Sequence, residues 1–95
     1  MTMPDPEAIR TRIGFFNDAA PLREPAFRVI DLVQDEQADV QVLAIATALT
    51  AVSEALGLSP HDLLQKIARA RNHIDGPFSG HYRAIVEYAR GELTR

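Results

Sequence analysis

The longest uniform pattern in the chain is an uncharged stretch from position 40 to position 53. It contains a series of apolar residues at three- and four-residue steps, namely Val42, Ile45, Leu49 and Val52. This spacing places all four side chains on one face of an α-helix, and a second face carries mainly alanines. Since a helix with two apolar faces is typical of a protein interior, residues 39–56 predict a buried central helix.

Local signals predict two shorter helices before this stretch. Asp5 followed by Pro6 is a favourable helix start, because aspartate caps free N–H groups and proline is tolerated at the first helical position. We expect this helix to end before Pro21 and the next to run over residues 25–34.

Acidic residues mark the junction between the second and the central helix. Asp31, Asp35 and Asp39 would repel one another at four-residue steps along one continuous helix. A break at residues 34–38 relieves this repulsion and places acids at a helix N-terminus, where they are favourable. We therefore predict two separate helices here, and one continuous rod is the alternative.

The clearest helix start follows the central stretch. Gly57 is suited to end the central helix in the left-handed conformation. Ser59 is a favourable N-cap, and Pro60 stands at the first helical position. The helix predicted here ends at about position 72, and its expected buried residues are Leu63, Leu64, Ile67, Ala68 and Ile74.

Turn-forming residues predict a loop over positions 73–80, in which Phe78 plugs the core. Ser79 is expected to cap a last helix that ends near Leu93. No stretch alternates as a β-strand would. The predicted fold is therefore all-α: a compact bundle of four to five helices around the central helix, forming a single domain over residues 1–95.

Composition narrows the classes of protein. The absence of cysteine excludes disulfides, thiolate metal sites and a cysteine nucleophile. The first ten residues lack the apolar core of a signal peptide. The uncharged stretch is shorter than the roughly 18 apolar residues of a membrane span. We therefore expect a cytoplasmic protein that does not contact a membrane.

The charge balance disfavours a nucleic-acid binder, because the formal net charge is −3. Residues up to position 39 carry a net charge of −4, from four arginines and eight acids, and the rest carry +1. Nine of the ten basic residues are arginine, a composition compatible with a small bacterial or phage accessory protein.

No pattern predicts catalysis. Ser59 and Ser79 are explained as helix caps. The histidines at positions 61, 73 and 81 lack the paired spacing of a zinc site, and there is no glycine-rich phosphate loop. We expect no enzyme activity, cofactor or metal.

Helix, glycine turn and capped helix also form the outline of a DNA-binding helix–turn–helix unit. In that interpretation the helix over residues 60–72 would contact DNA, and the candidate residues are His61, Gln65, Lys66, Arg69 and Arg71. Against it stand the length of the preceding helix, Asp62 on the side that would face phosphates, and the acidic chain.

The favoured hypothesis is a protein–protein interaction. A helix with two apolar faces in so short a chain indicates self-association, and a homodimer is expected; a monomer whose own helices cover both faces is the alternative. The candidate partner-binding residues are Asp31, Asp35, Glu36 and Asp39. The same acids suggest a third class, an acidic decoy that blocks a nucleic-acid-binding protein.

Overall fold

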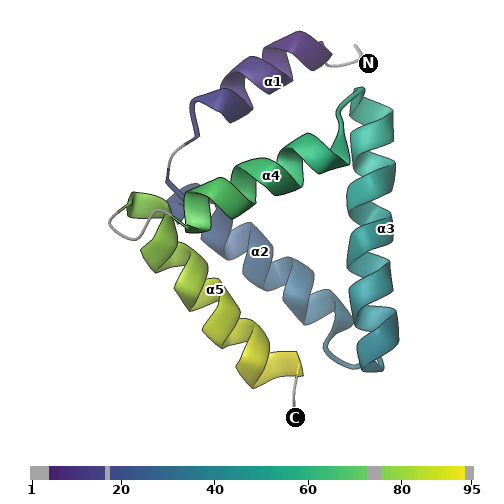
Figure 1. Ribbon diagram of the computed structural model, residues 1–95. Helices are drawn as coiled ribbons and strands as arrows, with labels where there is room; N and C mark the ends of the chain where they lie inside the picture. The colour runs from purple at the N-terminus through teal and green to yellow at the C-terminus, as the bar shows by residue number, and fades with distance from the viewer. Residues whose placement is uncertain (1–4, 17, 73–75, 94–95) are drawn as a thin grey trace.

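A computed structural model of the chain describes residues 5–16, 18–72 and 76–93. These residues form an all-α bundle without strands (Figure 1), which confirms the predicted fold class. Its helices are α1 (Pro6–Gly14), α2 (Ala20–Val33), α3 (Ala38–Leu56), α4 (Pro60–Arg71) and α5 (Pro77–Leu93).

The core lies mainly between α2 and α5, the two helices with the most extensive contact. Ile30 of α2 and Phe78 of α5 are buried, as is Ala19 just before α2. The ring of Phe27 stacks on that of Tyr88, with 4.2 Å between the ring centroids. The α2–α5 pair is therefore the part of the fold that tertiary packing stabilises most.

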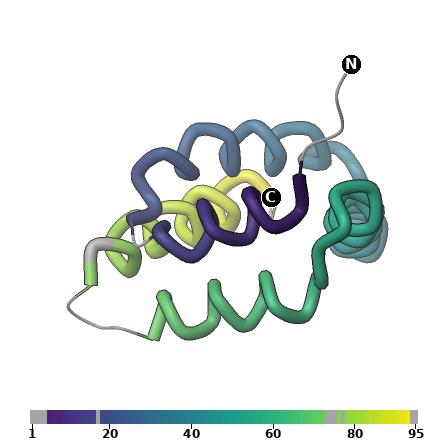
Figure 2. Tube along the Cα trace, turned by 90° about the horizontal axis from the view of Figure 1, so that it is seen from above, coloured from purple at the N-terminus to yellow at the C-terminus, as the bar shows by residue number. Residues whose placement is uncertain are grey.

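Helix α3 connects the two sides of the molecule rather than filling its centre. Figure 2 shows α2 and α4 on opposite sides of α5, with α3 seen end-on at one edge. In Figure 1, helices α2, α3 and α4 form the sides of an open frame. Helix α1 is the least attached, because every other helix makes a larger contact with a neighbour.

Local signals were confirmed at three helix ends. Asp5 caps α1 by accepting a hydrogen bond from the Glu7 N–H at 3.1 Å. Ser59 caps α4 by accepting one from the Asp62 N–H at 3.4 Å. Gly57 ends α3 in the left-handed region, at φ 71°. The predicted break is also present, since α2 ends at Val33 and α3 begins at residue 38.

Two predicted helix starts were wrong. Helix α2 begins at Ala20, about five residues early, because Pro21 occupies the first turn and Asp18 accepts a hydrogen bond from the Ala20 N–H at 3.0 Å. Helix α5 begins at Pro77, since proline is favoured at the first helical position, so Phe78 is buried on a helix rather than in a loop. Ser79 therefore lies inside α5 and donates its hydroxyl to the Gly76 carbonyl at 3.1 Å.

The burial expected of α3 and α4 is also wrong for the single chain. On α3 only Gln41 and Ser53 are buried, while Ile45 and Leu49 are half-buried and Val52 is 56% exposed. On α4 no residue is buried; Leu64 is exposed, and the other expected core residues that are described, Leu63, Ile67 and Ala68, are half-buried. His73 and Ile74 lie outside the described residues. Apolar periodicity identified these faces, but the neighbouring helices cover them only in part.

Substituting Gly57 by alanine is expected to destabilise the protein by about 2 kcal/mol. The left-handed conformation disfavours any Cβ, and a Cβ here would lie 2.9 Å from Cγ of Pro6 in α1. Urea unfolding measures the effect. Gly80→Ala is the control: its Cβ meets nothing within 4 Å, and alanine in a helix should stabilise by about 0.5–1 kcal/mol. Equal effects of the two substitutions would contradict the role assigned to Gly57.

Candidate functional site

Helix α3 exposes an apolar side over much of its length. Val42 is 66% exposed and Val52 is 56% exposed, ten residues apart on the side that also carries the half-buried Ile45 and Leu49. Leu43, on another side of the helix, is 65% exposed. No charged residue lies between Val40 and Ser53, so the whole length of this surface favours an apolar contact.

Each end of α3 carries a buried polar side chain with a hydrogen-bond partner. Near its start, the Gln41 side chain is buried and donates a hydrogen bond from Nε2 to the Val33 carbonyl at 3.0 Å. This bond satisfies the carbonyl of the last residue of α2. Near its end, the buried Ser53 hydroxyl donates to the Leu49 carbonyl at 2.7 Å. Helix α3 meets α2 and α4, and between these contacts it spans the edge of the frame.

Length and composition give α3 a second property. It is the one helix among the described residues that is long and apolar enough to cross a membrane, and only 11% of the relevant window is buried within the chain. A buried core helix also passes this test of length and composition, but a core helix is mostly covered. The apolar surface of α3 is therefore accessible to an apolar partner or to a lipid bilayer.

The four acidic candidates lie on three consecutive segments of the chain. Asp31 lies on α2, Asp35 and Glu36 lie in the turn, and Asp39 lies in the first turn of α3. All four are exposed. Asp31 accepts a hydrogen bond from the Tyr88 hydroxyl of α5, and Asp39 accepts one from the Val40 N–H at 2.9 Å. Two of the four carboxylates thus have local structural partners.

The Tyr88–Asp31 hydrogen bond predicts a measurable pH dependence. It raises the pKa of Tyr88 to about 12, and burial and the Asp31 charge act in the same direction. The unfolded chain loses this proton at a pKa of about 10, so the contribution of the bond to stability is present below pH 10 and fades between pH 10 and 12. Phenolate absorbance in a Tyr82→Phe background should report this titration.

Asp31→Asn in that background should lower the pKa of Tyr88, because the asparagine carries no negative charge. Asp35→Asn is the matched control, since no described interaction links it to Tyr88, and it should leave the titration unchanged. A Tyr88 that titrates near pH 10 in the unsubstituted protein would contradict the hydrogen bond.

The α4 candidates for DNA contact divide into two groups. His61, Gln65 and Arg69 are exposed and follow one another at four-residue steps, which places them on one face of the helix. Lys66 is half-buried beside this face. Arg71 instead lines a groove against α5, together with arginines that the sequence pattern had not singled out. Only the first group forms a continuous outward surface.

The histidines are not brought together in the described part of the chain. His61 lies on α4, and Nε2 of His81 on α5 is 3.8 Å from Oδ1 of Asp18. His73 lies outside the described residues. Over residues 5–16, 18–72 and 76–93, no group of three or more histidine, aspartate or glutamate residues is placed to hold a metal ion.

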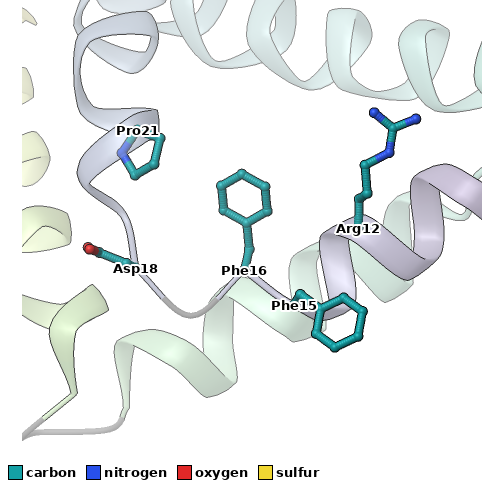
Figure 3. A pocket seen from close by; sticks show the side chains of 5 residues that line it. All are labelled: Arg12, Phe15, Phe16, Asp18 and Pro21. Atoms are coloured by element: carbon teal, nitrogen blue, oxygen red, sulfur yellow. The ribbon is translucent and has the colours of Figure 1, made fainter.

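A shallow groove beside the α1–α2 junction was not anticipated from the sequence. Figure 3 shows the Phe16 ring directed between Arg12 and Pro21, whereas Phe15 points away from it. Phe15 is 80% exposed. The two adjacent phenylalanines after α1 were the signal for this groove in the sequence.

Comparison with known proteins adds no assignment: no family model matches the chain, and no curated protein or solved structure is significantly similar to it.

Proposed function

We propose that this protein is a small non-catalytic interaction protein that acts as a homodimer, with the exposed apolar side of α3 in the dimer interface. The observation that carries the proposal is the exposure of α3. Val42 and Val52 are more than half exposed in the single chain, and no charge interrupts the surface between them. Water contact with such a surface is unfavourable, so a partner that covers it gains the hydrophobic free energy.

The surface area of the chain supports the same proposal. The single chain exposes 7221 Å². A folded monomer of 10.5 kDa is expected to expose about 5,400 Å². The difference of roughly 1,800 Å² exceeds the ~800 Å² that each partner buries in a standard interface. The radius of gyration, 14.2 Å, is likewise above the roughly 12 Å expected for a chain of this length.

A second copy is the occupant that best fits this surface. An uncharged helix face requires an uncharged partner, because burying an unpaired charge against it is costly. The chain itself presents such a face on α3, and a twofold axis brings the same patch of both copies together. The charged ends of the helix, Asp39 and Glu54, flank the uncharged stretch and would limit the register of the pairing.

Sedimentation equilibrium over a concentration series tests the proposal. A homodimer should be observed in the micromolar range, and its thermal midpoint should rise with protein concentration. A monomer at high micromolar concentration would contradict the proposal. Flotation with uncharged lipid vesicles is the second measurement, because vesicle binding by a monomer would assign the α3 surface to a bilayer instead.

One observation favours DNA binding as a second candidate function. The exposed row His61, Gln65 and Arg69 lies on a helix that follows a three-residue turn. Binding to duplex DNA should weaken steeply as salt rises, and Lys66→Glu with Arg69→Glu should abolish it without unfolding the protein. The absence of a gel shift at low salt would exclude this function.

A further inference from the structure

The end of α4 and one side of α5 enclose a basic groove of about 340 Å³. Its polar lining consists of Arg71, Asn72, Ser79, Tyr82, Arg83, Glu87 and Arg90. The α5 members recur at three-, four- and seven-residue steps, so they share one side of that helix. Side chains of α4 and α5 thus place cations and hydrogen-bond donors around one space, which no residue of α3 lines.

Within the described part of the chain, acidic residues do not balance the positive charges of this groove. Arg90 is paired with Glu87, through Nη1 and Oε1 at 2.9 Å. Among the described residues, neither Arg71 nor Arg83 has an acidic partner within ion-pair distance. Three arginines and one glutamate therefore give the groove a net positive charge, although the chain as a whole carries −3.

Tyr82 gives the groove a fixed wall. Its ring stacks with that of Phe78, with 6.2 Å between the centroids, and Phe78 is buried in the core. The tyrosine is therefore positioned by packing, and the arginines around it are exposed at the rim. An aromatic wall held in place by the core, with guanidinium groups around it, is suited to an anionic ligand of small size.

We propose that this groove binds the phosphate group of a small ligand. Arginine donates pairs of hydrogen bonds in a planar fork that matches phosphate oxygens, and the Asn72 amide and Tyr82 hydroxyl add further donors. A phosphate monoester offers three terminal oxygens to these converging donors, one more than a carboxylate. The volume of the groove lies in the range of small-molecule sites, and the acidic chain opposes a long nucleic acid.

Inorganic phosphate is the probe, and amide chemical shifts in NMR titrations are the measurement. Saturable shifts are expected at residues of the α4–α5 groove with phosphate, whereas chloride at equal ionic strength should not produce them. Arg71→Gln and Arg83→Gln should each weaken binding about tenfold. Arg28→Gln is the matched control: Arg28 is exposed on α2 and does not line the groove, so its substitution should leave the affinity unchanged.

Each part of this experiment has a result that would overturn the proposal. Shifts that chloride reproduces, or equal losses in all three arginine variants, would show a non-specific charge effect and overturn the proposal. Acetate that binds as tightly as phosphate would overturn the assignment to a phosphate group. The substituted side chains are exposed, so unfolding of the variants is not expected. Because α3 does not line the groove, a monomeric α3 variant should still bind phosphate, which separates this proposal from the dimer.

Discussion

Replacing Val42 and Val52 together by glutamate is expected to convert a dimer into a monomer. In the single chain both positions are more than half exposed, so the substitutions should change monomer stability by no more than about 0.5 kcal/mol each. In the proposed dimer both lie in an uncharged interface. There each glutamate removes apolar contact and brings a carboxylate without a partner out of water, at a cost of several kcal/mol. Dimer affinity should fall at least 100-fold, or about 3 kcal/mol.

Thr47→Glu is the matched control for this experiment. Thr47 is exposed on the same helix, but helical periodicity places it on the side opposite Ile45 and Leu49. A charge there should leave the association unchanged. Sedimentation equilibrium measures the affinity, and far-ultraviolet circular dichroism confirms that the helices are retained. Loss of association in the control alone would assign the interface to the opposite side of α3.

The helix caps and helix ends that depend on residues nearby in the sequence were predicted correctly. Asp5 and Ser59 cap helices, and Gly57 takes the left-handed conformation, because each acts on backbone groups within three or four residues. The break after Val33 was also predictable, since the repulsion of successive acids along one helix is a local effect. The two wrong starts concern prolines, because a proline is compatible both with the loop before a helix and with its first turn.

The burial of an apolar face is not a local property. The spacing of Ile45, Leu49 and Val52 shows which side of α3 avoids water, but not whether the same chain or another covers it. Likewise, Arg71 and Arg83 are twelve residues apart, and only the packing of α4 on α5 brings them to one groove. The sequence therefore identified the helix that carries the candidate interface, whereas the phosphate site required the tertiary arrangement.

The largest effect on folding is expected from Phe78→Ala. Phe78 is 7% exposed, and with Ala19 and Ile30 it makes up the buried apolar core of the described residues. Removing a buried phenylalanine typically costs about 3–5 kcal/mol, from lost burial and from the cavity that remains. A domain of this size has only about 5–14 kcal/mol of stability in total. The variant should therefore unfold at a much lower urea concentration, and the groove should lose its Tyr82 wall.

Phe15→Ala is the matched control, because it removes the same side chain from a position that is 80% exposed. It should shift the free energy of unfolding by less than about 0.5 kcal/mol. Similar losses from the two phenylalanines would place the core elsewhere than between α2 and α5. A loss of stability in Phe15→Ala that grows with protein concentration would instead place Phe15 in the dimer interface. A contact between copies adds stability only when the copies associate, and association increases with concentration. Comparing the two variants thus separates packing within the chain from packing between chains.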